Sequence, residues 1–162
     1  MGPDFIPIRL TLAELCVAAL MQAADDLNAA RDHAAFLEAL ANNYCLWQAL
    51  TEAGEKNRQV VLSPRDCEFV LRRSSCVGHS LSDADVETLC AINRRISRDI
   101  ARNIDIPRVR ARAELAHQEA HGDGFMTWLL GEAHRKIWME THAPPNCEIG
   151  FSQRGSPRSA SV

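Results

Sequence analysis

Hydrophobic residues recur at intervals of three and four positions along most of the chain, which is the spacing of one face of an α-helix. The first such stretch follows Thr11, and Glu14 completes a capping-box pattern for a helix that runs to about Leu27. A second stretch begins near Asp32 and continues to a polar break at residues 52–57. The pattern therefore predicts two long amphipathic helices at the start of the chain.

Two further helices are predicted by their start signals. Ser63 followed by Pro64 is typical of a helix N-terminus, because proline lacks the N–H that the first turn leaves unpaired. Ser82 and Asp85 repeat the capping spacing before the next apolar stripe. That stripe is interrupted by Asn93, which falls among apolar residues at helical spacing.

The last third of the chain has a weaker pattern followed by a stronger one. Pro107 marks a boundary, because proline disfavours helical backbone at the residue before it. Residues 108–121 have helical propensity but few large apolar side chains, so we expect a loosely packed or projecting helix. Two glycines in residues 122–124 end it, and residues 125–140 form a strongly amphipathic helix.

Together these elements predict an all-α, single-domain bundle of five to six helices. We expect residues 1–106 to form the core and residues 107–145 to form a helical extension that packs on the core or projects from it. Residues 146–162 are rich in Ser, Arg, Gly and Pro, and this composition predicts a disordered tail.

Composition changes this picture little. The chain has 162 residues, 46% hydrophobic and 24% charged, which is typical of one globular domain. Its apolar runs are far shorter than the roughly 20 residues of a membrane span. The first residues lack the pattern of a signal peptide, so we expect a cytoplasmic protein without membrane association. The six cysteines have no paired short spacing and are expected to be reduced thiols.

Charge is distributed unevenly along the chain. The net charge of −3 divides into −5 for residues 1–56, +4 for residues 57–113 and −2 for residues 114–162. All eleven cations of the middle part are Arg, whose planar side chain suits carboxylate or phosphate partners. We interpret them as paired with acids on neighbouring helix faces; an Arg-mediated nucleic-acid binder is an alternative.

Catalytic chemistry has little support in the sequence. No catalytic residue is predicted, and no cofactor. The alternative from another class is a metal-dependent enzyme or metal-binding protein, because Glu114, His117 and His121 recur at helical spacing. His134 or Glu132 of the next helix could supply a further ligand. The glutamate at position 119 is one residue late for the zinc-protease motif, so surface histidines are the simpler interpretation.

Two tryptophans give the last helix more apolar surface than one stripe would hide. Trp128 and Trp138 are accompanied by Phe125 and Ile137. Core packing explains part of this surface, and the remainder could be a partner-binding face.

Asn93 needs its own explanation. A buried asparagine without hydrogen-bond partners costs about 1–3 kcal/mol. We expect Asn93 to bond across to Asn43 or to a free backbone carbonyl and so to lock two helices. The neighbouring Arg94 and Arg95 are expected to reach acids in the first two helices.

Four short segments, in the same order and at nearly the same spacing, resemble the flagellar biosynthesis regulator FlaF, a small helical bacterial family. The matching residues are Leu20, Met21, Ala23 and Ala24, then Asn43, Leu46, Trp47 and Leu50, then Phe69, Val70 and Arg72, and finally Ile92, Asn93 and Arg94. The resemblance covers residues 10–104. Tyr44 and Cys45 stand where the family has paired arginines, and residues 64–66 replace a small apolar stretch.

The resemblance implies a non-enzymatic regulator or chaperone-like binding protein of flagellin synthesis and flagellar assembly. Its partner would be flagellin or a companion flagellar regulator. The residues that the resemblance assigns to partner binding or packing are Asn43, Leu46, Trp47, Phe69, Arg72, Asn93 and Arg94.

Overall fold

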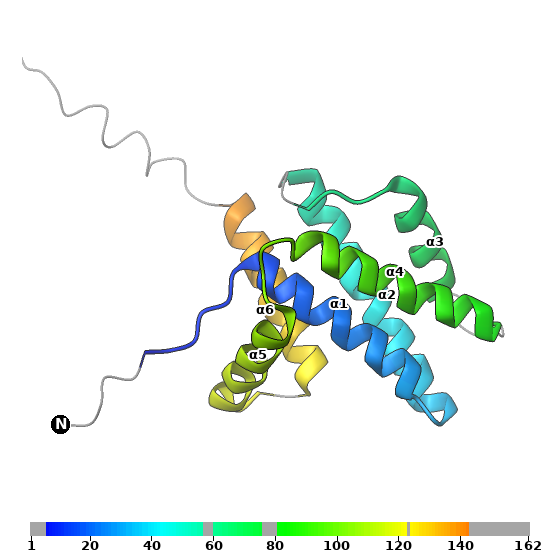
Figure 1. The fold of residues 1–162 in the computed structure, drawn as a ribbon, viewed down its shortest axis with the longest axis horizontal. Helices are drawn as coiled ribbons and strands as arrows, with labels where there is room; N and C mark the ends of the chain where they lie inside the picture. Colours follow the sequence, from blue (N-terminus) through cyan, green and yellow to red (C-terminus); the bar gives the residue numbers. More distant parts are fainter. Residues whose placement is uncertain (1–5, 57–59, 76–80, 123, 143–162) are drawn as a thin grey trace, which may run out of the picture.

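The chain folds into an all-α, single-domain bundle (Figure 1). A computed structural model describes residues 6–56, 60–75, 81–122 and 124–142. Within them lie six helices and no strand: α1 (Leu12–Ala29), α2 (His33–Lys56), α3 (Pro64–Ser74), α4 (Asp83–Ile100), α5 (Ile106–Ala120) and α6 (Phe125–Thr141). None of these helices combines the length and apolar character needed to cross a bilayer.

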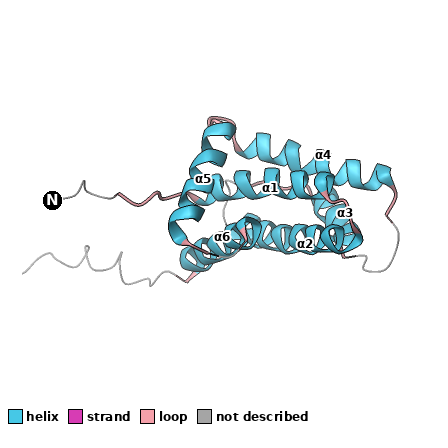
Figure 2. Cartoon of the chain, turned by 90° about the horizontal axis from the view of Figure 1, so that it is seen from below, coloured by secondary structure: helices cyan, strands magenta, loops and turns pink. Residues whose placement is uncertain are grey.

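The helices form two layers, and α1 contacts helices of both. Figure 2 shows α1 with α4 and α5 in one layer, and α2 with α6 in the layer below. The short helix α3 packs against α2 and α4. Six consecutive residues of α1, at positions 15–20, are buried, so this helix is covered on all sides rather than along one stripe.

The predicted capping boxes are both present. The Glu14 backbone N–H donates to Thr11 Oγ1 at 3.1 Å, and the Thr11 N–H donates to Glu14 Oε1 at 3.0 Å. Ser82 and Asp85 make the same reciprocal pair at the start of α4. These contacts satisfy N–H groups that a helix leaves unpaired at its first turn.

The polar break predicted at residues 52–57 is wrong, because α2 continues through Gly54 to Lys56. Ala53 is buried in the core, which keeps this turn of the helix against the bundle. A Cβ at Gly54 would lie 3.1 Å from the carbonyl oxygen of Val60. The glycine therefore lets the returning chain pass close to α2 and does not end the helix.

The last two helices belong to the same core as the first four. Helix α5 packs against α1 through Val109, Ala113 and Ala116, so it does not project. Helix α6 adds Leu129 and Ile137 to the same hydrophobic cluster. The C-terminal helices therefore pack on the first four, which is one of the two arrangements expected for residues 107–145. The tail predicted at residues 146–162 lies outside the described residues.

Candidate functional site

A chain of buried side-chain hydrogen bonds joins α2, α3 and α4. Trp47 Nε1 donates to Asn93 Oδ1 at 2.8 Å, and Asn93 Nδ2 donates to Asn43 Oδ1 at 2.8 Å. Asn43 Nδ2 then donates to Ser74 Oγ at 2.9 Å. We call these four residues the buried polar chain. All four are buried, and the bond expected between Asn93 and Asn43 is present.

The direction of the buried polar chain is fixed at one end. The indole of Trp47 can only donate, so Asn93 must turn its oxygen toward it and its NH2 group toward Asn43. Asn43 must then accept from Asn93 and donate to Ser74. Each amide has one satisfied orientation, and the chain therefore selects one arrangement of the three helices.

Burial divides the residues that the flagellar resemblance assigned to binding or packing. Leu46 is buried like Asn43, Trp47 and Asn93, so none of these side chains can touch a partner at the surface. Phe69, Arg72 and Arg94 are at least partly accessible. On α3 the exposed Arg72 pairs with Glu68 at 2.8 Å, and the guanidinium carbon of Arg73 lies 5.7 Å from the Phe69 ring centre.

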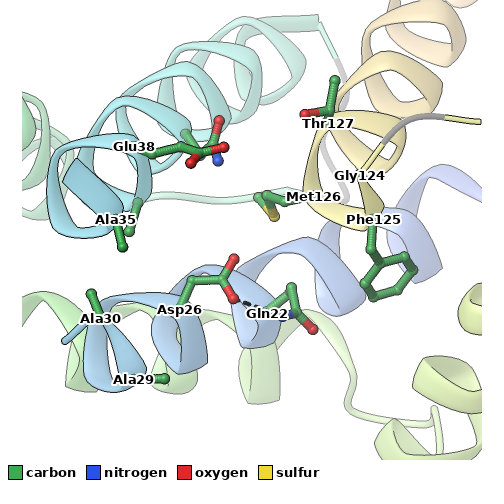
Figure 3. A pocket seen from close by; sticks show the side chains of 12 residues that line it. Gln22, Asp26, Ala29, Ala30, Ala35, Glu38, Gly124, Phe125, Met126 and Thr127 are labelled. Atoms are coloured by element: carbon green, nitrogen blue, oxygen red, sulfur yellow. Dashed lines mark hydrogen bonds between the residues drawn. The ribbon is translucent and has the colours of Figure 1, made fainter. Parts of the chain in front are cut away.

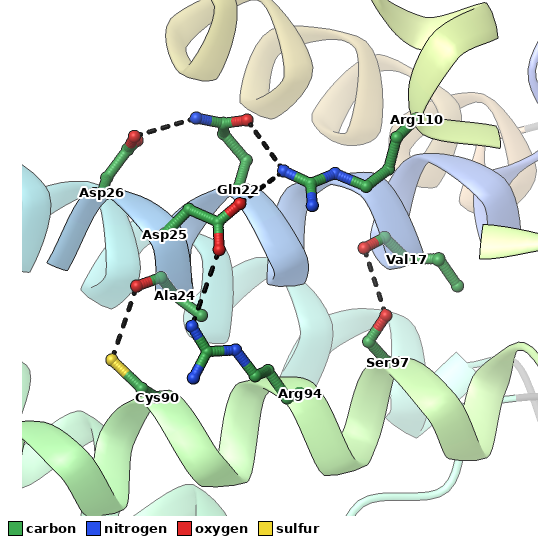
Figure 4. Close-up of polar contacts among 9 residues, drawn as sticks. All are labelled: Val17, Gln22, Ala24, Asp25, Asp26, Cys90, Arg94, Ser97 and Arg110. Carbon is green, nitrogen blue, oxygen red and sulfur yellow. Dashed lines mark hydrogen bonds and ion pairs between the residues drawn. The ribbon is translucent and has the colours of Figure 1, made fainter. Parts of the chain in front are cut away.

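Two small polar side chains join α4 to the backbone of α1 (Figure 4). Cys90 Sγ donates to the carbonyl oxygen of Ala24 at 3.4 Å, and Ser97 Oγ donates to that of Val17 at 3.3 Å. Ser97 lies seven residues after Cys90 on α4, whereas its acceptor Val17 lies seven residues before Ala24 on α1. The two helices therefore run antiparallel. Burial is the main cause that raises the pKa of the Cys90 thiol, which keeps it a donor.

Asp25 of α1 holds two arginines from different helices (Figure 4). Arg110 of α5 approaches it at 2.6 Å and Arg94 of α4 at 3.6 Å. The expectation for Arg94 is thus confirmed, since its acid lies in the first helix. The expectation for Arg95 is wrong, because Arg95 pairs with Asp66 of α3 at 2.5 Å.

A cleft of about 390 Å³ lies between the end of α1, the start of α2 and the start of α6 (Figure 3). Asp26 and Glu38 line it from opposite helices, and Gln22 Nε2 donates to Asp26 Oδ1 at 2.8 Å. Burial raises the pKa of the Asp26 carboxyl, and the charges of Asp25 and Glu38 add to this effect. The described part of the chain therefore places an incompletely compensated carboxylate in this cleft.

The alternative metal site does not form among the described residues, where no three His, Cys, Asp or Glu side chains lie close enough to hold an ion. His117 instead packs its ring against Phe125 and Trp128, with ring centres 5.4 and 5.5 Å away. His121 follows the end of α5 and has left-handed backbone with φ of 50°. It therefore leaves the helical face on which the spacing had placed it.

The two tryptophans of α6 have different surroundings. Trp128 is half-buried against the core, and its ring lies nearly parallel to that of Phe125, with ring centres 6.4 Å apart. Trp138 is 60% exposed and stacks with His142 at 4.7 Å between ring centres. Only part of the proposed aromatic face is therefore at the surface.

The cysteines described by the structure are free thiols: Cys16, Cys45, Cys67 and Cys90. Burial, with a smaller effect of Glu140, raises the pKa of Cys16 to about 12. Cys16 is therefore a neutral packing residue at physiological pH and not a nucleophile.

Comparison of the chain with protein-family models, with curated proteins and with solved structures finds no match. The flagellar hypothesis therefore depends on the residues quoted for it and on how they lie in the fold.

Two serines that make buried hydrogen bonds between helices, Ser74 and Ser97, were not predicted from the sequence. Ser97 could have been found, because it lies one helical turn after Asn93 on a face that is otherwise apolar. Ser74 gives no such signal, since it is the last residue of α3 and is buried only because α3 packs against α2.

Proposed function

We propose that the protein is a non-enzymatic regulator that binds flagellin in the cytoplasm and acts in flagellin synthesis and flagellar assembly. The observation that carries this proposal is the contact of Trp47 and Asn43 with Asn93. These residues come from two separate segments of the flagellar pattern, 46 to 50 positions apart. The contact supports the proposal because it brings two segments of the pattern together in one place of the fold.

Because the buried polar chain cannot touch a partner, the binding surface must use accessible residues of the same pattern. Phe69 and Arg72 lie one turn apart on α3, with Arg73 beside them. An aromatic ring flanked by arginines is a common centre of a protein interface. We therefore place flagellin on this face of α3.

The other classes considered have no specific observation in their favour. Six of the eleven arginines of the basic middle part pair with acids of the same chain in the described residues, among them Arg94, Arg95 and Arg110. This pairing lowers the positive potential that nucleic-acid binding would need.

The test is capture of purified monomeric flagellin from the same organism by the full-length protein. Arg72→Glu should weaken capture by about tenfold or more, as expected for a charge at an interface centre. Arg98→Glu is the matched control, because Arg98 is also an exposed helical arginine and lies on α4. Wild-type protein that captures no flagellin contradicts the proposal, and equal capture by wild type and Arg72→Glu contradicts the α3 face.

A further inference from the structure

A groove of about 430 Å³ lies where residues 7–10 pass α6 before α1 begins. Figure 1 shows this N-terminal segment running beside α5 and α6. The apolar lining includes Ile8, Trp128 and Met139, and Met139 is 54% exposed. A hollow that combines apolar and charged lining matches the two faces of an amphipathic segment.

The groove is positively charged in a protein whose net charge is −3. Arg9, Arg135 and Lys136 line it, and Glu132 is the acid among the lining residues. Glu132 pairs with Arg135, whereas no acidic partner is found for Arg9 or Lys136 in the described part of the chain. The lining therefore has a net charge of +2 and favours a negatively charged occupant.

The chain's own C-terminal residues are a poor match for this charge. Residues 143–162 contain Arg154 and Arg158 but only Glu148 as an acidic side chain. Their side chains sum to +1, so they offer no excess of negative charge to the groove. Charge complementarity therefore points to another molecule.

The shape of the groove indicates which kind of molecule. Its α6 wall consists of Trp128, Glu132, Arg135, Lys136 and Met139, which recur at three and four positions. Eleven residues of helix rise about 16 Å, or three turns. A wall of this length suits an amphipathic helix with apolar anchors one turn apart.

We infer that the groove between residues 7–10 and α6 binds an acidic amphipathic helix of a partner protein. Leucine-like side chains of that helix would lie against Trp128 and Met139, and its carboxylates against Arg9 and Lys136. These cations lie outside residues 10–104, so the inference goes beyond the flagellar proposal and does not depend on it.

The test uses a fluorescein-labelled designed peptide of about 18 residues, with Leu at one helical face and Glu on both flanks. A second peptide has Lys in place of each Glu, and a third has Ser in place of each Leu. Fluorescence anisotropy with the full-length protein should show saturable binding of the first peptide, weakening as salt is raised. Both other peptides should bind at least about tenfold more weakly.

Two matched double variants locate the peptide. Arg135→Glu with Lys136→Glu should weaken binding by about tenfold or more. Arg98→Glu with Arg102→Glu makes the same change in net charge on exposed residues of another region and should leave binding within about twofold. In wild-type protein the indole N–H resonance of Trp128 should shift on binding, whereas that of the buried Trp47 should not.

Equal affinity for the Glu and Lys peptides, equal loss in both double variants, or no saturable binding would overturn the inference. So would a second copy in the groove, seen as a change in sedimentation mass on Arg135→Glu with Lys136→Glu. A shift of the Trp128 resonance caused by Phe151→Glu without peptide would instead place residues 143–162 there, and would also overturn it. Flagellin capture can fail while the peptide binds, so the two proposals fail separately.

Discussion

Between α2 and α4 the polar side chains are fully buried and hydrogen-bonded in one order, whereas between α1 and α5 charged side chains meet over small apolar residues. Asn43, Trp47 and Asn93 make the first contact, and Ala113 with the pair Arg110 and Asp25 makes the second. We call these the central contact and the α5 contact. A buried polar contact is costly when one partner is lost, while a partly exposed ion pair contributes little.

The two contacts therefore specify the fold in different ways. In the central contact, donors and acceptors permit one arrangement of the helices. In the α5 contact, the fully buried Ala113 permits close approach of two helix backbones, and the ion pair adds orientation at the rim. The central contact should therefore be sensitive to chemistry, and the α5 contact to volume.

The largest effect is expected from Asn93→Leu, which keeps the size of the side chain but removes its polar atoms. Trp47 Nε1 and Asn43 Oδ1 lose their partners while buried, so the free energy of unfolding should fall by about 2–4 kcal/mol. Urea unfolding measures this change. The matched control is Asn103→Leu at an exposed position, which should stay within about 0.5 kcal/mol. A similar small change at both positions would contradict the account of the central contact.

The second effect concerns volume in the α5 contact. Ala113→Leu would place a large side chain where α5 lies against α1, and should lower the free energy of unfolding by about 1–3 kcal/mol. The same substitution at the exposed Ala111 should have little effect. Thermal unfolding of both variants makes the comparison. Equal stability of the two variants would show that α5 does not pack closely.

The smallest effect is expected from Asp26→Asn, beside the α5 contact. Because the folded state raises the pKa of Asp26 above its unfolded value of about 3.9, the folded state binds the proton more tightly. Stability contributed by this group is thus present at low pH and is lost as pH rises through the raised pKa. Asp26→Asn should increase the free energy of unfolding at pH 7 by less than about 1 kcal/mol.

That gain should vanish below the unfolded-state pKa, where Asp26 is protonated in both states. Unfolding curves at pH 7 and at low pH measure it, with Asp99→Asn as an exposed control. The amide oxygen introduced by the substitution would still accept from Gln22, so the hydrogen bond is kept. A loss of stability at pH 7 would show that the carboxylate is compensated in the folded protein.

Local signals in the sequence predicted much of the fold. Capping boxes at Thr11 and Ser82 define two helix starts through contacts within one turn. The proline at position 64 favours a third start through its fixed φ and missing N–H. Asn93 could be assigned a buried partner because an amide on an apolar stripe has few alternatives. Such features depend on neighbours in sequence or on a strict requirement for hydrogen bonds.

Features that depend on distant packing could not be predicted in this way. Gly54 looked like a helix break because the reason for a glycine there is a tertiary contact. The chain returns after α2 and brings the Val60 carbonyl oxygen close to Gly54. Helix α5 looked loosely packed because alanines signal little apolarity, although they allow the close approach to α1. His121 left its predicted face because α5 ends one residue earlier.

The most direct test of the central claim is hydrogen exchange of the full-length protein with and without purified monomeric flagellin. We expect added protection in peptides that cover α3, where Arg72 is exposed and Phe69 is partly accessible, and no added protection at the already buried Asn93. Unchanged exchange throughout the chain at saturating flagellin would contradict it.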